Sequence, residues 1–333
     1  MKNLKVKWEE ISDKARWDGF VGKMKQGSVY DTWRWRDVLE SEGYRPLYLG
    51  ATDGRGSLVG VCPLYLTRYH GPTHVLSTWP PFSELSGPLL ATEDIRQTEE
   101  VVKALIESIP RTPLRAALHI RTANRSIAES LTHLGYEIHD GAGAFLVDLE
   151  RNPPELMWKH TFRKDERREI RHFEMQQPLV ALRDDVGGLC TFYEAHKRLM
   201  LRRRYKIAPL SLFSSIRKNF RDSFRILFVE TAEGIAATSL LIDEERKTVH
   251  LPHVGYDPAK NSRSLMFYCD WKAMTWAHES GYRYVNLGNG SSNPLSRNYR
   301  FKKRFGGNFV TRYWCTAYLN PLVRLVRFAL RLG

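Results

Sequence analysis

Hydrophobic and polar positions follow two different periods along the first 150 residues, which predicts a mixture of helices and strands. Glycines close the helical stretches, and the turn Asp53-Gly54-Arg55-Gly56 separates two alternating stretches. The pattern predicts helices over 32–43, 94–109 and 124–134, and strands over 46–52, 57–68, 115–120 and 144–149. A loop rich in proline, glycine and aromatic residues is expected over 79–88.

The second half of the chain repeats this order of elements. Its predicted helices span 154–176, 187–203 and 264–280, and its predicted strands span 224–231, 235–243, 248–256 and 284–287. A helix pair, a strand meander, a helix and a strand thus occur roughly twice, which indicates an internal duplication of pattern. We place the boundary at Asn152-Pro153-Pro154. This predicts domains over 1–152 and 153–319, followed by a short segment over 320–333.

Length and composition agree with two globular domains. A chain of 333 residues exceeds the usual size of one hydrophobic core, and 42% hydrophobic with 26% charged residues is typical of folded proteins. The four cysteines lie far apart without a CxxC pair, which argues against a disulfide framework or a zinc site. No signal peptide and no apolar run of about 20 residues is visible. We therefore expect a cytoplasmic protein without a metal.

Charge is distributed unevenly between the halves. Residues 1–150 carry 18 Lys and Arg against 20 Asp and Glu, whereas residues 151–333 carry 33 against 17. The second half therefore has a formal charge of +16, which favours a polyanionic partner: nucleic acid, an anionic membrane or a phosphorylated substrate. A solvated basic surface is the alternative.

The segment Ser296–Gly307 combines basic and aromatic residues just after a predicted strand end. We predict a loop here that holds an anionic group or a developing oxyanion. Phe301 and Phe305, four residues apart, are expected to anchor it, and an exposed basic run is the alternative.

Four motifs in the second half resemble the FemAB / CelD-BioF-type acyltransferases, which are built from GNAT-like domains in tandem. The motifs are Trp158 with Arg167–Arg171, Phe192-Tyr193-Glu194 with the basic residues after it, Gly281–Gly288, and Phe301–Gly306, which matches F-K-x-x-F-G. The first half resembles the family's N-terminal domain through Trp35, Gly60, Pro63-Leu64 and Gly87-Pro88-Leu89. The resemblance implies an α/β (α+β) protein with two tandem GNAT-like acyl-CoA N-acyltransferase folds.

The chemistry that the resemblance implies is transfer of an acyl or aminoacyl group to an amine. Negative charge develops on the carbonyl oxygen, and a donor placed there contributes about 10²–10³ in rate. Carried over from the family motif, the catalytic lysine is Lys302. Arg300 and Phe301 beside it are expected to bind substrate.

Further candidates come from the residues around the predicted strand ends. Asn286 is expected to contact substrate, and because an amide is no base, Tyr256, Asp257, His253 or the substrate itself must take the proton. Tyr256 is our catalytic candidate. Arg204 and Tyr205 are expected to bind phosphates with a stacking ring, the alternative being a solvated helix end.

The donor remains open between acyl-CoA, an acyl carrier protein and aminoacyl-tRNA. GNAT enzymes bind the coenzyme A pyrophosphate on a glycine-rich turn before a helix. The corresponding segment, Asp257–Ser264, has no glycine pair, although Lys260 and Arg263 are expected to bind phosphate. This favours a bulkier donor such as aminoacyl-tRNA. We expect no bound cofactor.

The sequence therefore predicts an N-acyltransferase or aminoacyltransferase acting on an amine of an anionic acceptor, small or lipid-linked and related to the cell envelope or a polysaccharide. The alternative is a non-catalytic module that binds nucleic acid or anionic lipid. The C-terminal residues 320–333 place Arg324, Arg327 and Arg331 on one helical face. This predicts weak peripheral contact with an anionic membrane, or packing of a terminal helix on its own domain. The sequence does not indicate the oligomeric state.

Overall fold

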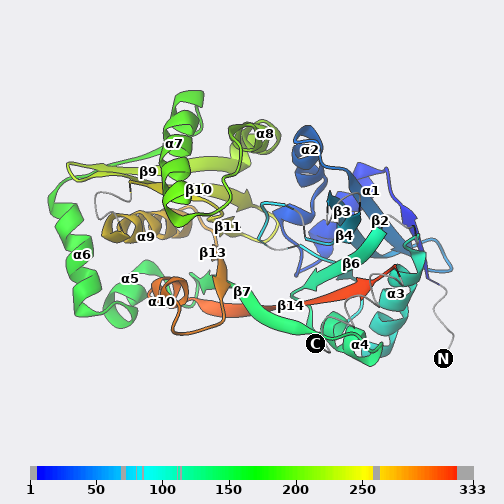
Figure 1. The fold of residues 1–333 in the computed structure, drawn as a ribbon. Coiled ribbons are helices and arrows are strands. Elements are labelled where there is room, and N and C mark those ends of the chain that lie inside the picture. Colours follow the sequence, from blue (N-terminus) through cyan, green and yellow to red (C-terminus); the bar gives the residue numbers. More distant parts are fainter. Residues whose placement is uncertain are drawn as a thin grey trace, which may run out of the picture. The chain divides into compact units, whose positions relative to one another are not determined.

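A computed structural model describes residues 6–68, 73–79, 81–84, 86–110, 112, 115–257 and 263–320, with Arg68 and Arg263 described for the backbone alone. The chain divides into two compact units. Unit 1 comprises Met1–Ala142 and Thr311–Gly333, and unit 2 comprises Gly143–Val310. Each unit contains its own part of one hydrogen-bonded sheet (Figure 1).

Unit 1 has a mixed sheet in the order β1-β2-β3-β4-β6-β14, with β5 paired to β3. Its strands are β1 (Lys7–Glu10), β2 (Pro46–Thr52), β3 (Leu58–Arg68), β4 (His74–Ser77), β5 (Leu89–Leu90) and β6 (Arg115–Thr122). Its helices are α1 (Lys14–Lys23), α2 (Trp33–Ser41), α3 (Ile95–Ser108), α4 (Arg125–His133) and a 3-10 turn, Val29–Asp31. Helix α3 joins the parallel strands β4 and β6, as a βαβ crossover requires.

Unit 2 has a sheet in the order β7-β13-β11-β10-β9-β8, with β12 paired to β10. Its strands are β8 (Leu179–Arg183), β9 (Phe224–Thr231), β10 (Gly234–Asp243), β11 (Thr248–His250), β12 (Val254–Tyr256) and β13 (Tyr284–Ser291). Its helices are α5 (Pro154–Leu156), a π-helical turn (Met157–Thr161), α6 (Lys164–Met175), α7 (Val186–Arg203), α8 (Leu210–Phe220), a 3-10 turn (Arg221–Ser223), α9 (Arg263–Glu279) and α10 (Arg297–Lys303). Helix α9 joins the parallel strands β11 and β13.

Strands β7 (His139–Asp148) and β14 (Asn308–Tyr318) each pass from one unit to the other. The meander β2-β3-β4, helix α3 and strand β6 correspond in order to β9-β10-β11, α9 and β13. The last strand of each repeat is exchanged: β7 lies beside β13 in unit 2, and β14 pairs with β6 in unit 1. The units therefore change at 142/143 and 310/311, whereas the sequence predicted a linear boundary at 152/153 with residues 311–319 in the second domain.

Each unit has a separate hydrophobic core. In unit 1, the apolar face of α3 packs through Val101, Leu105 and Ile106 on sheet residues such as Leu118 and Ile120. In unit 2, α9 is buried on nearly all sides against β9, β10 and β13. Side chains cap the helices near the strand ends: Asp94 accepts from the backbone of α3, Asn124 from α4 and Ser296 from α10.

Most predicted elements are confirmed, with three corrections. The helix predicted over 154–176 is interrupted, because Phe162 and Arg163 are extended between the π-helical turn and α6. The strand predicted over 248–256 is split into β11 and β12 around Pro252, which has no N–H for a ladder. The loop predicted within Ser296–Gly307 instead contains the helix α10, which Ser296 caps.

Candidate functional site

The parallel strands β11 and β13 separate at their carboxyl ends. They pair from Thr248 with Tyr284 to His250 with Asn286, and the N–H of Leu251 still donates to the carbonyl of Asn286. Beyond this point β12 pairs with β10, while β13 continues to Ser291. Crevices at the carboxyl ends of parallel strands are where α/β proteins bind ligands, so this opening in unit 2 is the candidate site.

The peptide group between Leu287 and Gly288 is held from two sides at this opening. Its N–H donates to Asn286 Oδ1 at 2.9 Å, and its carbonyl accepts from Lys302 Nζ. A trans peptide directs its N–H and C=O in opposite directions, so Asn286 and Lys302 approach it from opposite sides. Gly288 has φ of +79°, a conformation that glycine adopts without a Cβ clash.

Lys302 extends from α10 to the separated part of β13. Its Nζ donates to the carbonyl of Leu287 and, at 2.7 Å, to that of Asn289. These two hydrogen bonds fix a positive charge at the strand end. The sequence predicted both Lys302 and Asn286 as site residues, and the fold brings them to one peptide group. Their roles stay predictions.

Asp270 faces the charge of Lys302 from helix α9. The residue is 5% exposed, and its Oδ1 has no hydrogen-bond partner among the described residues. Burial raises the pKa of this carboxyl to about 7, and the nearby Lys302 opposes that rise. A carboxyl of this kind exchanges a proton near neutral pH, which makes Asp270 a candidate acid–base group.

His250 completes the polar residues at the opening. The side-chain amide of Asn286, which is fully buried, donates to His250 Nδ1 at 3.1 Å. Accepting at Nδ1 fixes the neutral ring with its proton on Nε2. Sequence reasoning missed both His250 and Asp270. His250 lay inside the strand predicted over 248–256, and only the observed end of β11 at this residue places it at the opening, whereas Asp270 lies within a helix and only its burial reveals it.

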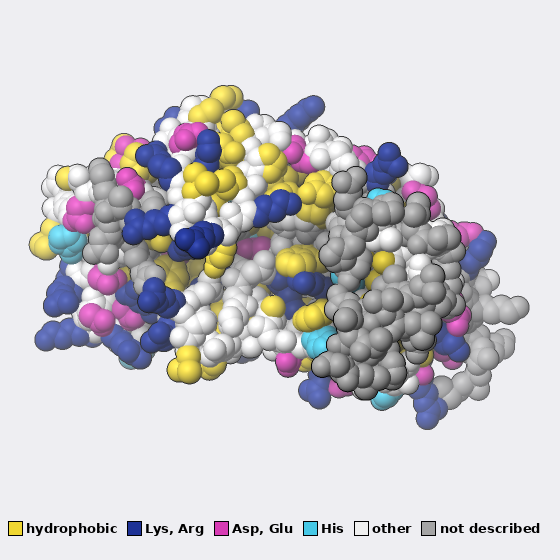
Figure 2. All heavy atoms as spheres, in the orientation of Figure 1, with side chains coloured by type: hydrophobic (Ala, Val, Ile, Leu, Met, Phe, Trp, Pro, Cys, Tyr) yellow, Lys and Arg dark blue, Asp and Glu magenta, His cyan; other side chains and the backbone are white. Residues whose placement is uncertain are grey.

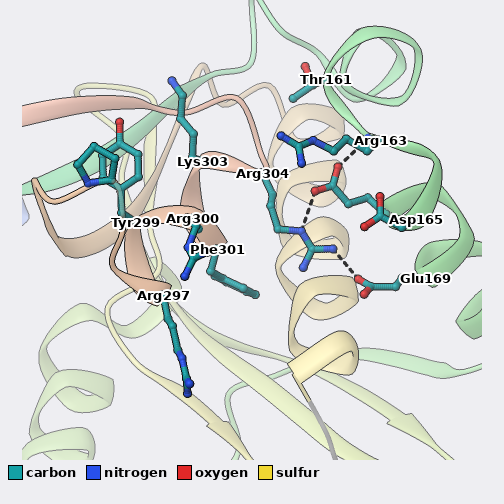
Figure 3. A pocket seen from close by; sticks show the side chains of 12 residues that line it. Thr161, Arg163, Asp165, Glu169, Arg297, Tyr299, Arg300, Phe301, Lys303 and Arg304 are labelled. Atoms are coloured by element: carbon teal, nitrogen blue, oxygen red, sulfur yellow. Dashed lines mark hydrogen bonds and ion pairs between the residues drawn. The ribbon is translucent and has the colours of Figure 1, made fainter.

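A pocket of about 610 Å³ lies between α6 and α10 in unit 2 (Figure 3). Arg304 donates there to Glu166 at 2.9 Å and to Glu169 at 2.6 Å. Arg300, Phe301 and Lys303 line this pocket, whereas Lys302 does not. The basic residues of 296–307 therefore serve two places: Lys302 reaches the strand opening, and its neighbours face the pocket.

Tyr256 lies on β12 and belongs to the core of unit 2. It is 7% exposed, and its hydroxyl accepts from Arg203 at 2.9 Å. Arg204 ends α7 with φ of +55° and is exposed, as is Tyr205 after it. In Figure 2, Lys and Arg side chains are frequent on unit 2 over α6, α7 and α10. The substrate-binding roles predicted for Arg204 and Tyr205 stay predictions.

The structure describes only one of the two residues that were predicted to bind phosphate before α9, and that one for its backbone alone. Lys260 lies outside the described residues, as does the segment 321–333, and Arg263 is described only as the first backbone position of α9. His253 packs against the rings of His196 and Phe213, and burial lowers its pKa to about 3. A ring that remains neutral in this setting favours the packing role over the catalytic one.

The described ranges contain neither a metal-binding cluster nor a membrane-spanning helix. Within them, no group of three His, Cys, Asp or Glu side chains is arranged to hold a metal ion. None of the described helices combines the length and the apolar character needed to cross a membrane.

Comparison with known proteins identifies the fold. Residues 160–303 match the family model described as an acetyltransferase (GNAT) domain. The crystal structure of FemX matches with a TM-score of 0.71 and 14% identity, covering 96% of this chain and 99% of that one. No curated protein matches the sequence.

Two further structures show the same architecture. The C-terminal domain of a putative lysylphosphatidylglycerol synthetase from Agrobacterium fabrum matches with a TM-score of 0.60 and 13% identity, covering 94% of both chains. A tandem GNAT protein from the clavulanic acid biosynthesis pathway matches with a TM-score of 0.58 and 11% identity, covering 96% of this chain and 99% of that one. The prediction of two tandem GNAT-like folds, similar to the FemAB type, is thereby confirmed.

Proposed function

From a chain with two GNAT-like units in tandem, we propose transfer of an acyl or aminoacyl group to an amine at the opening between β11 and β13. The observation that carries this proposal is the fixed charge of Lys302 at the end of β13, facing the buried carboxyl of Asp270. Acyl transfer needs both a positive group for a developing oxyanion and a proton acceptor for the amine.

In the proposed step, the nitrogen of a neutral acceptor amine attacks the carbonyl carbon of the donor. A C–N bond forms, and the C–O bond of an ester or the C–S bond of a thioester breaks. Lys302 stabilises the negative charge on the carbonyl oxygen. Asp270 accepts the proton that the amine loses and returns it to the leaving hydroxyl or thiol, so that protons balance. Asn286 keeps the Leu287–Gly288 peptide in the orientation that Lys302 requires.

The donor is proposed to be an aminoacyl-tRNA, with an acyl-CoA as the second candidate. The charge of +16 on residues 151–333 supports a polyanionic donor. The names of the similar structures include both an aminoacyl-lipid synthetase and a tandem GNAT protein solved without AcCoA. The acceptor is proposed to be an amine on an anionic molecule, small or lipid-linked, and Arg300 and Phe301 are proposed to contact substrate from α10.

The experiment supplies the full chain with a pool of charged tRNAs and acyl-CoAs, together with simple amine acceptors. Mass spectrometry then follows which donor is consumed and which amine gains the acyl mass. We expect one donor class to be consumed by the wild-type chain and preserved by Lys302→Met. Tight, salt-sensitive tRNA binding without consumption of any donor would instead support the non-catalytic alternative.

A further inference from the structure

Unit 1 has its own pair of parallel strands with a polar end. Strands β4 and β6 pair up to Ser77 with His119, and the N–H of Thr78 then donates to the carbonyl of His119. This repeats the arrangement in unit 2, where Leu251 follows the last pair of β11 and β13. Thr78 also bonds both the N–H and the carbonyl of Arg121 through its hydroxyl. The chain after β4 is thereby tied to the end of β6.

Two arginines lie at this strand end. Arg121 on β6 stacks on Trp79, with its guanidinium carbon 3.5 Å from the ring centroid. Arg312 on β14 is 7% exposed. The register pairs Arg121 with Trp314, two residues from Arg312. Because side chains alternate along a strand, both arginines leave the same face of the sheet as diagonal neighbours.

This arrangement is electrostatically costly. Burial is the main reason that the pKa of each guanidinium group falls to about 10, and for Arg121 the charge of Arg312 contributes to this lowering. Glu84, which is 4% exposed, and Tyr30 favour the charged form of Arg312. Each guanidinium group therefore has a like charge as a neighbour in a largely buried setting. Buried like charges at such a position are expected where a ligand supplies the compensating charge.

We propose that Arg121 and Arg312 form a phosphate-binding site in unit 1, at the carboxyl ends of β4 and β6. A guanidinium donates in a planar fork that matches the oxygens of a phosphate. One carboxylate has two oxygens and suits a single fork, whereas a phosphate has enough oxygens for both arginines. The phosphate belongs to a soluble phosphorylated molecule or to a lipid headgroup. The inference rests on unit 1 alone and stands whether or not the transfer reaction proposed for unit 2 is right.

The test measures phosphate binding by the full chain without any acyl donor. The probes are inorganic phosphate and glycerol 3-phosphate, titrated by calorimetry at constant ionic strength. Phosphatidylglycerol and phosphatidylcholine vesicles form a second arm that separates a lipid headgroup from a soluble phosphate. The variants are Arg121→Gln and, as a matched control, Arg125→Gln, which changes an exposed arginine of α4 paired with Glu129.

We expect the wild-type chain to bind one of these probes, Arg121→Gln to bind it at least tenfold more weakly, and Arg125→Gln to bind it as the wild type does. Arg312→Lys keeps the charge and removes the fork, so it should also weaken binding while circular dichroism shows a folded chain. Absence of binding by the wild type in both arms, or equal binding by Arg121→Gln, would overturn the proposal.

Discussion

The two parallel strand pairs, β4 with β6 in unit 1 and β11 with β13 in unit 2, have the same connection but opposite chemistry at their carboxyl ends. In unit 2 the end is open, and the charge of the lysine there acts on a buried carboxyl of raised pKa. In unit 1 the chain after β4 is tied across the end of β6, and two arginines remain close together. A proton acceptor beside a fixed cation suits a reaction, whereas adjacent guanidinium groups suit binding of an anion.

Under the two proposals, the duplicated fold divides its tasks between the units. The register places Gly288 of β13 where β6 has Arg121, two residues after the last strand pair in each case. Glycine at that position permits the positive φ that turns a peptide toward Lys302. Arginine at the same position supplies a side chain to the face of the sheet. Gly288 thus determines the backbone conformation at the end of β13, and Arg121 provides a positive charge at the end of β6.

The largest expected effect is that of Asp270→Asn on activity. Loss of a general base costs about 10²–10⁴ in rate, and the wild-type rate should rise with pH through a midpoint near 7.

Asp270→Asn should also stabilise the fold at pH 8. A carboxyl whose pKa is raised by folding binds its proton more tightly in the folded state, so stability falls as pH rises from about 4 to 7. The asparagine removes that penalty.

Thermal unfolding at pH 5 and pH 8, together with pH–rate profiles, measures both effects. The control is Asp243→Asn, which breaks the buried ion pair with Arg246 and should destabilise the chain. Wild-type activity without a step near pH 7, combined with an active Asp270→Asn variant, would refute the proton-acceptor role.

Lys302→Met should lower turnover by about 10²–10³, as expected for loss of a group at the oxyanion. It should also cost about 1–3 kcal/mol of stability, because the carbonyls of Leu287 and Asn289 lose their donor. Removing this charge raises the pKa of Asp270 further, so any residual activity should need a higher pH. Lys303→Met, which changes the exposed neighbour, is the control. Full turnover by Lys302→Met in steady-state assays would exclude its catalytic role.

Much of the fold could be predicted from the sequence because local patterns dictate it. Strand β9 has the predicted bounds, and α9 differs from its prediction by one residue at each end. The exchange of β7 and β14 could not be predicted, since a strand's partner depends on long-range register and not on its own pattern. A linear reading therefore placed the boundary at Asn152 and not within β7.

The candidate site was accessible to sequence reasoning only where a motif marked it. Lys302 and Asn286 belong to motifs, and the fold joins them through one peptide group. Asp270 lies inside helix α9, and its significance depends on burial that no local pattern encodes. Arg121 and Arg312 are 191 positions apart, and only the pairing of β14 with β6 brings them together.

Gly288→Ala should have a moderate effect that tests the role of the backbone. A Cβ at φ of +79° costs about 1–2 kcal/mol, and any relaxation moves the Leu287 carbonyl away from Lys302. Gly281→Ala is a matched control, since Gly281 has φ of +81° and a Cβ there would meet no atom within 4 Å. Thermal midpoints should fall similarly in both variants, and only Gly288→Ala should lose turnover. Equal activity of the two variants would show that the peptide orientation is not needed.

The smallest expected effect is that of Trp79→Leu in unit 1. The indole stacks on Arg121 and donates through Nε1 to the carbonyl of Ser83 at 3.0 Å. A partly buried cation–π contact contributes about 0.5–2 kcal/mol. Without the indole, the guanidinium of Arg121 should be less well oriented, while its charge remains. Phosphate should therefore bind roughly 2–30-fold more weakly to Trp79→Leu. Trp158→Leu removes a comparable arginine contact in unit 2, where Arg171 lies 5.3 Å from the ring centroid. Calorimetric titration should show unchanged phosphate binding in that control. Similar weakening in both variants would mean that the effect is general destabilisation, and the distinction between a binding end and a reactive end would lose its support from Trp79.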